Sequence, residues 1–502
     1  MGAQFNMTIS KKIPQTVLTV LENIKKKDFE AFIVGGCVRD LILERIPNDW
    51  DVTTNATPEE ILKIFPDGKY ENRFGTVIVP EKYLGALEST NNIEITTYRI
   101  ESTYSDNRRP DEIKFAKTLE EDLKRRDFTV NAMAIDFTDE KNYRIIDLFD
   151  EQTDLKNHLI KTVNDANERF NEDALRIIRA IRFVAQLTSP SQEWKIEEKT
   201  LEAIKKNIDL LKHISQERLR DEFSKIILSD NPALGVELLI ETGAMQYIIP
   251  EIYQTIEVTQ NRHHYHGPYN TVYKHLLASL KNCPSKKLEV RLATFLHDIG
   301  KPESKRGQGE FSTFYSHEYI GAKKAHKILS RLKFPKKVID KTILLIKNHM
   351  FYYNVDEVGE KGVRRVIQKV GLENINDLID VRIGDRLGSG TAKAVPYKLR
   401  HFKYIVEKVS TDAVSVGQLK INGNDLIKIL KIKPGPKIGA ILDILLAEVI
   451  EDSSLNNFDQ LSQRATELDK ENLEDLRKLA KNKIKEKKES DDKEIKNKYW
   501  VK

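Results

Sequence analysis

The stretch that decides the fold is Gly35-Gly36-Cys37-Val38-Arg39-Asp40, followed after a short gap by Asp49-Trp50-Asp51. The double glycine predicts a tight turn, because glycine adopts backbone conformations that other residues avoid. The apolar run at residues 30–34 predicts a strand before the turn, residues 37–45 predict a helix after it, and residues 49–53 a second strand. Further strands are expected at residues 76–79, 93–98 and 113–115, so an α/β unit is predicted over residues 28–150.

Asp49 and Asp51 form the first candidate site. Side chains at positions i and i+2 of a strand lie on the same face, so these two carboxylates should point together. Two carboxylates this close repel each other unless a cation joins them. Mg²⁺ binds carboxylates together with substrate phosphates, and a pair of such ions can activate an attacking hydroxyl and hold a leaving pyrophosphate. An Asp-x-Asp pair alone is more often an ordinary solvated strand, and the preceding glycine-rich turn is what favours a catalytic pair.

The same turn is a candidate phosphate site. Gly35 and Gly36 would let backbone N–H groups approach a triphosphate, and the N-terminus of the following helix would add its dipole. Arg39 is expected to share in holding the phosphates. Glu94, on a neighbouring predicted strand, is a candidate third carboxylate near the metal ions.

These residues together resemble the nucleotidyltransferase signature of the DNA polymerase beta superfamily. More narrowly, they are similar to class II tRNA nucleotidyltransferases, the CCA-adding enzymes, and to the related bacterial poly(A) polymerases. The resemblance continues in order along most of residues 28–230 and includes Arg125-Arg126-Asp127. It implies that Arg126 and Asp127 contact the ribose of the incoming nucleotide.

Asp173 and Arg176 have a chemical reason to read a base. They are three residues apart in a helix predicted from residue 172 to residue 185, so their side chains should be neighbours. A carboxylate only accepts hydrogen bonds and a guanidinium only donates them. Cytosine and adenine both offer an amine donor beside a ring-nitrogen acceptor, whereas guanine and uracil offer the reverse. The pair alone would be an ordinary helical ion pair; the resemblance makes it a base-reading motif, adds Arg179, and implies that residues 215–223 support the site.

The resemblance implies template-independent addition of C, C and A to the 3′ end of tRNA, with CTP and ATP as substrates and Mg²⁺ as cofactor. The segment from Arg99 to Pro110 is similar to a loop found in family members that add the terminal A, which leaves full CCA enzymes and A-only enzymes open. A poly(A) polymerase is a further alternative, although no arginine-rich segment is obvious at residues 71–77. An HD-type signalling-nucleotide hydrolase with a nucleotide-sensing head is an alternative of a different class.

Histidines and aspartates of the next part of the chain resemble the metal ligands of HD-superfamily phosphohydrolases. Imidazole and carboxylate ligands suit Mn, Fe, Ni, Mg or Zn, so the divalent metal stays open. The resemblance implies a phosphatase or phosphodiesterase side activity in addition to CCA synthesis. The expected ligands, in chain order, are His275, His297, Asp298, His317, His349 and Asp385.

Helical periodicity dominates beyond residue 156, so the predicted class is α+β. A polymerase-beta-like head with a small sheet should be followed by all-helical neck, HD and body domains. The predicted divisions are an N-terminal helix at 1–27, the head at 28–155, the neck at 156–250, the HD domain at 251–410, the body at 411–468 and a charged tail at 469–502.

Composition excludes several classes of protein. A mean hydropathy of -0.49, with no long apolar run, argues against a membrane span. Two cysteines among 502 residues exclude a disulfide scaffold and favour a reducing cytoplasm. The net charge of +5 is concentrated in the tail, which is predicted to be a solvated helix or a disordered arm.

Overall fold

The computed structural model describes residues 12–72, 75–85, 91–101, 113–137, 142–260, 271–308, 312–355, 357–391, 393–411, 419–451 and 453–501. The chain divides into two compact units, residues 1–346 and 347–502, and each unit is considered by itself. The loop expected between Arg99 and Pro110 falls almost entirely outside the described residues. The finer domain boundaries given above stay predictions.

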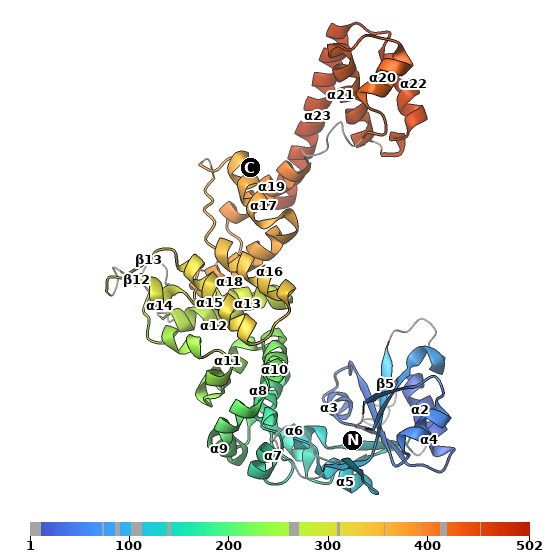
Figure 1. The fold of residues 1–502 in the computed structure, drawn as a ribbon, viewed down its shortest axis with the longest axis vertical. Coiled ribbons are helices and arrows are strands. Elements are labelled where there is room, and N and C mark those ends of the chain that lie inside the picture. Colours follow the sequence, from blue (N-terminus) through green and yellow to red (C-terminus); the bar gives the residue numbers. More distant parts are fainter. Residues whose placement is uncertain are drawn as a thin grey trace. The chain divides into compact units, whose positions relative to one another are not determined.

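The head is built on a seven-stranded sheet with the order β3-β4-β5-β2-β1-β8-β9 (Figure 1). Neighbouring strands are antiparallel except β2 and β5, which run parallel. All five strands predicted from the sequence are present, each to within one residue at either end, whereas β3, β6, β8 and β9 were not expected. The strands are β1 (Ala31–Val34), β2 (Trp50–Thr54), β3 (Lys69–Asn72), β4 (Thr76–Pro80), β5 (Asn92–Thr97), β8 (Ala134–Phe137) and β9 (Tyr143–Ile146), with β6 (Arg99–Glu101) and β7 (Ile113–Phe115) as a separate pair.

The two faces of this sheet have different roles. Register places Ile33 beside Val52 and Val52 beside Ile95, and all three are fully buried. Helices α2 (Gln15–Lys25) and α4 (Pro58–Ile64) cover one face of the sheet, and α3 (Gly36–Ile42) lies at the other (Figure 1). Helix α4 has a defined start, because the side chain of its N-terminal cap, Thr57, accepts from the Glu60 N–H in a reciprocal capping box. The apolar residues therefore take one face and leave the alternate positions of β2 and β5 to the opposite face.

The helix predicted from residue 172 to residue 185 is interrupted in the structure. Helix α7 (Ala166–Glu172) ends one residue before Asp173, whose backbone is extended, and α8 (Leu175–Leu187) starts two residues later. The reason is local: an Asp173 carboxylate oxygen accepts from the Leu175 N–H at 3.0 Å, which favours a new helix start over helix continuation. The other helices up to the end of the neck are α5 (Leu119–Lys124), α6 (Glu151–Lys156), α9 (Glu198–Asn207), α10 (Gln216–Leu228) and α11 (Pro232–Glu241).

Helices dominate the rest of the described chain, which confirms the α+β class. Two short strand pairs interrupt them, β10 (Leu159–Ile160) with β11 (Lys195–Ile196) and β12 (Lys305–Arg306) with β13 (Thr313–Phe314). None of the helices in the described part of the chain is long and apolar enough to cross a membrane. The tail is helical, as one of its two predicted states required, but this helix packs against other helices of the second unit and is not purely solvated. The helices are α12 (Val272–Lys281), α13 (Leu288–Leu296), α14 (Lys301–Ser304), α15 (His317–Arg331), α16 (Lys336–Asn348), α17 (Glu360–Val370), α18 (Ile375–Gly388), α19 (Tyr397–Thr411), α20 (Gly423–Leu430), α21 (Pro436–Glu451), α22 (Phe458–Leu468) and α23 (Leu473–Tyr499).

Candidate functional site

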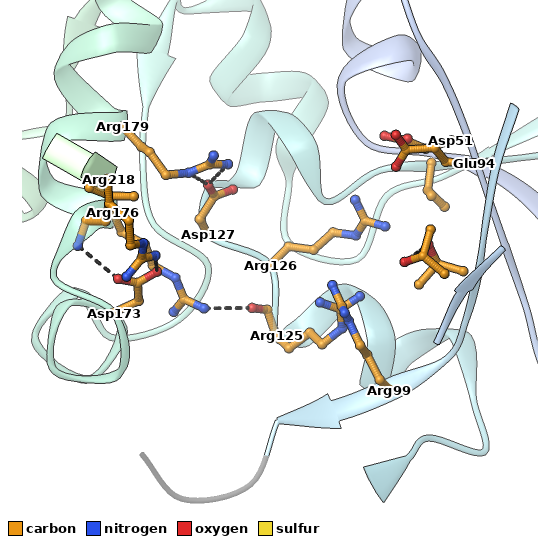
Figure 2. Close-up of a pocket in the computed structure, with 14 residues that line it drawn as sticks. Asp51, Glu94, Arg99, Arg125, Arg126, Asp127, Asp173, Arg176, Arg179 and Arg218 are labelled. Carbon is orange, nitrogen blue, oxygen red and sulfur yellow. Dashed lines mark hydrogen bonds and ion pairs between the residues drawn. The ribbon is translucent and has the colours of Figure 1, made fainter. Parts of the chain in front are cut away.

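A pocket of about 360 Å³ lies between the start of α8 and the face of the sheet that carries Asp51 and Glu94 (Figure 2). Its volume is in the range of small-molecule sites. Seven of the candidate site residues predicted from the sequence line it, which brings the head and the neck together around one cavity. Its charged lining residues are Asp51, Glu94, Arg99, Arg125, Arg126, Asp127, Asp173, Arg176, Arg179 and Arg218.

Carboxylates make up one end of this pocket. Asp51 in β2 lies directly beside Glu94 in β5, on the same face of the sheet. Burial raises the pKa of Asp51, and the negative charge of Asp49 raises it further, although Arg126 opposes both effects. Burial also raises the pKa of Glu94, with the charge of Asp51 as the next cause. Asp49 itself is exposed and directly precedes β2, outside the residues that line the pocket. Acidic oxygens held together against their repulsion fit a hard divalent cation.

The glycine turn is packed against this acidic end. Gly35 has a φ of 84°, and a Cβ added to it would lie 3.0 Å from Arg126 Nη1 and 3.2 Å from an Asp51 carboxylate oxygen. The positive φ therefore favours glycine here, and a Cβ would crowd the side chains of Arg126 and Asp51. Gly36 starts α3. Arg39, predicted to hold phosphates, donates to the Asn131 side chain at 2.7 Å and to Asp40 at 2.9 Å, and it does not line the pocket. Its part in phosphate binding stays a prediction.

Asp127 joins the head to the neck. Its carboxylate accepts from Arg179 Nε at 2.7 Å and from Arg179 Nη2 at 2.5 Å, and also from the Phe128 N–H at 2.9 Å. Burial alone would raise the pKa of Asp127, but Arg179 and then Arg176 lower it to about 2. Asp127 is therefore ionised at neutral pH and aligned by two donors of one guanidinium. Arg126 lies between this pair and the acidic end (Figure 2).

Asp173 and Arg176 line the far end of the pocket, but each is held by a different partner. Asp173 accepts from Arg218 Nη2 at 2.6 Å. Arg176 donates to Glu172 at 2.5 Å and to the Arg169 carbonyl at 3.2 Å. The expected placement of the two residues on one helix is thus wrong, because Asp173 precedes α8. The segment predicted to support the site includes Arg218, although its ion pair with a residue 45 positions away could not be read from the sequence.

Sequence reasoning missed Asp122. This fully buried carboxylate accepts from Arg125 Nε at 2.9 Å and from Arg125 Nη2 at 2.8 Å, and Arg126 Nη2 lies 3.5 Å from its second oxygen. The sequence signal that could have identified Asp122 is its spacing from the arginines, since residues three and four positions apart on a helix are neighbours. Asp122 precedes the two arginines by those intervals.

A second cluster of polar side chains is buried between α12, α13 and α15 of the first unit. His275 Nε2 lies 3.0 Å from His297 Nε2, and each lies 3.3 Å from one oxygen of Asp298. His317 Nε2 lies 3.2 Å from the other Asp298 oxygen. Lys301 Nζ also contacts this carboxylate, at 2.6 Å. Four of the predicted HD ligands therefore converge.

The tautomers of two of these histidines follow from their surroundings. His297 Nδ1 lies 2.8 Å from the Thr294 carbonyl and His317 Nδ1 lies 2.6 Å from the Phe314 carbonyl. A carbonyl only accepts, so both Nδ1 atoms carry protons and both Nε2 atoms can offer lone pairs toward Asp298. Lone pairs directed at a carboxylate are stable only with a proton or a metal cation between them. The donor set therefore fits a divalent cation.

His349 and Asp385, the remaining predicted HD ligands, belong to the second unit. His349 is fully buried and directly follows α16. Asp385 lies on α18 and accepts from Arg382 Nη1 at 2.7 Å. Their participation in the metal site stays a prediction.

Family models match three consecutive parts of the chain. Residues 31–161 match the model described as "Poly A polymerase head domain". Residues 194–255 match "Probable RNA and SrmB- binding site of polymerase A", and residues 272–389 match "HD domain". The last match includes all six predicted HD ligands.

Known proteins resemble the chain over most of its length. The CCA-adding enzyme of Ligilactobacillus salivarius is 33% identical over 458 residues, which cover 90% of this chain and 96% of that protein. The CCA-adding enzyme of Lactococcus lactis is 47% identical over 244 residues, which cover 47% of this chain and 57% of that protein, so this match spans little more than half of the relative. A solved structure of the Bacillus stearothermophilus CCA-adding enzyme in complex with CTP aligns with a TM-score of 0.59 and 27% identity, covering 91% of this chain and 97% of that one. The chain therefore belongs to the family of CCA-adding enzymes, the tRNA nucleotidyltransferases.

Proposed function

We propose that this protein adds C, C and A in turn to the 3′ end of tRNA that lacks them, using CTP and ATP without a nucleic-acid template. The observation that carries this proposal is a single pocket. It has carboxylates at one end, the fixed side chains of Asp173 and Arg176 at the other, and arginines between them. The solved relative in complex with CTP supports a nucleotide as the occupant.

Mg²⁺ is the proposed cofactor at the acidic end. Asp49 and Asp51 would hold it, with Glu94 as a further oxygen ligand beside Asp51. When bound, the metal lowers the pKa of the attacking 3′-hydroxyl and neutralises charge on the leaving pyrophosphate. Gly35 and Gly36 would let backbone N–H groups approach the phosphates.

Selection of the nucleotide falls to the residues at the centre and the far end of the pocket. Arg126 and Asp127 would contact the ribose, and Arg179 fixes Asp127. Asp173 would accept from the exocyclic amine of C or A, and Arg176 would donate to the adjacent ring nitrogen. Both side chains are held in place before any base arrives, so little ordering is required on binding. One pair would then read both nucleotides.

A phosphatase or phosphodiesterase activity is proposed for the HD cluster. Nε2 atoms and carboxylate oxygens converge there in a buried site, as a divalent metal requires. Mn, Ni, Fe or Mg would suit these ligands. The proposed ligand set is His275, His297, Asp298, His317, His349 and Asp385.

Transcripts of one tRNA that end before CCA, after the first C and after the second C test the proposed activity. The full-length protein should extend the first transcript with CTP and then ATP, and the last with ATP alone. Addition of A only to the transcript that ends in CC would instead indicate an A-only enzyme. Runs of A on unrelated RNA would indicate a poly(A) polymerase, and no addition at all would favour a nucleotide-sensing head.

A further inference from the structure

We propose that Asp122 is a positioning residue of the nucleotide pocket, which aligns Arg125 and Arg126 and thereby sets the preference for ribonucleotides over deoxyribonucleotides. The inference rests on the proposed function, because it takes Arg126 as a ribose contact. Asp122 does not line the pocket itself, so it would act only through these arginines.

Five groups from three segments of the head converge on this one carboxylate. One oxygen accepts from Arg125 Nε and Nη2, at 2.9 and 2.8 Å, and lies 3.4 Å from the Arg99 N–H. The other oxygen accepts from the Thr53 hydroxyl at 3.3 Å and lies 3.5 Å from Arg126 Nη2. The Asp122 side chain has no exposed surface, so water does not compete for these contacts.

Asp122 is negatively charged at neutral pH. Burial would raise its pKa, but Arg125 and Arg126 outweigh that effect and lower it. A buried carboxylate is stable only when its charge and its lone pairs are satisfied. The positions of both arginine side chains therefore depend on Asp122, and both side chains line the pocket.

Thr53 connects Asp122 to β2, the strand that carries Asp51. It lies two positions after Asp51 on β2, so both side chains lie on the same face of the sheet. Asp122 therefore fixes Arg126 relative to the strand that carries the proposed metal ligand. Arg126 has a second contact, to the Asn131 carbonyl at 3.3 Å, which would keep it near the pocket but would not set its distance from Asp51.

The test compares equilibrium affinities for ATP and 2′-deoxy-ATP, measured by calorimetry on the full-length protein without tRNA. Asp122→Asn removes the charge and keeps the shape, and we expect the affinity ratio to shrink about tenfold. In an Arg126→Ala background the same substitution should leave the ratio unchanged, because the ribose contact that Asp122 positions is gone. Asp136→Asn is the matched control: Asp136 also binds cations of the head, Lys25 at 2.9 Å and Arg144 at 3.5 Å, but it does not line the pocket. Its ratio should equal that of the parent.

An unchanged ratio in folded Asp122→Asn, or an equal loss with and without Arg126, overturns the inference. If Asp122→Asn does not fold, Thr53→Val decides, since it removes the hydroxyl that contacts Asp122 and the Thr96 carbonyl and leaves the charge of Asp122 in place. A smaller shift in the same direction supports the proposal and an unchanged ratio refutes it. Because binding is measured without tRNA, this result is independent of the addition assay that tests the proposed function.

Discussion

Replacing Asp173 by asparagine should relax the choice of base without disturbing the neck. One Asp173 oxygen accepts from the Leu175 N–H at 3.0 Å at the start of α8, and the asparagine carbonyl can keep that bond. The amide nitrogen then takes the place of the second oxygen, which now accepts from Arg218 Nη2 at 2.6 Å. Two donors would face each other there, and the exocyclic amine of C or A would lose its acceptor.

The expected size of the effect follows from that unpaired amine. Leaving a partly buried donor without a partner costs about 1–3 kcal/mol. Preference for CTP and ATP over UTP and GTP should therefore fall roughly tenfold to hundredfold. Because one pair reads both nucleotides, the C and A additions should lose selectivity together.

Single-turnover addition of each of the four nucleotides to tRNA lacking CCA measures this change. Asp165→Asn is the control, because Asp165 caps α7 by accepting from the Glu168 N–H at 3.0 Å and lies outside the pocket. Unchanged discrimination against UTP and GTP in Asp173→Asn would show that the Asp173–Arg218 pair is purely structural.

Two further predictions concern the Asp127–Arg179 pair and the HD cluster. The folded-state pKa of Asp127 is lowered to about 2, so the ionised carboxylate stabilises the fold above its ordinary pKa and this stabilisation is lost as pH falls through about 2. Asp127→Asn should lower the melting temperature at pH 7, and the difference in melting temperature from the parent should become smaller below about pH 4. A difference that does not depend on pH would contradict this assignment. The double variant His297→Ala with Asp298→Ala should lose metal-dependent phosphoester hydrolysis and keep CCA addition. The parent, loaded with Mn²⁺, Ni²⁺ or Mg²⁺, should hydrolyse a phosphoester that the double variant leaves intact. If it hydrolyses none, the assignment is refuted.

Local chemistry predicted much of the head and less of the pocket. The Gly35 turn, the strand that carries Asp51 and the capped start of α4 follow from residue types at short spacing. The parallel pairing that sets Asp51 beside Glu94 is a register between distant strands, which the sequence pattern only suggested.

Side-chain partners distant in sequence were the hardest to foresee. A single helix through Asp173 is favoured by periodicity, but its carboxylate competes for the Leu175 N–H and starts a new helix. Arg39 has the charge expected of a phosphate ligand, and its contact with the Asn131 side chain, 92 positions away, could not be read from the sequence. The burial of Asp122 could not be predicted, because an aspartate in a charged helix is usually solvated and only the tertiary fold buries this one.

The central claim is that nucleotide addition takes place at the Asp51 end of this pocket. It is tested most directly by incubating tRNA that lacks CCA with labelled CTP and ATP, with the parent and with Asp51→Ala. We predict that the parent restores CCA and that the variant adds neither nucleotide, while its melting temperature and its HD-site phosphoester hydrolysis match those of the parent. Addition by Asp51→Ala within about tenfold of the parental rate would contradict the claim.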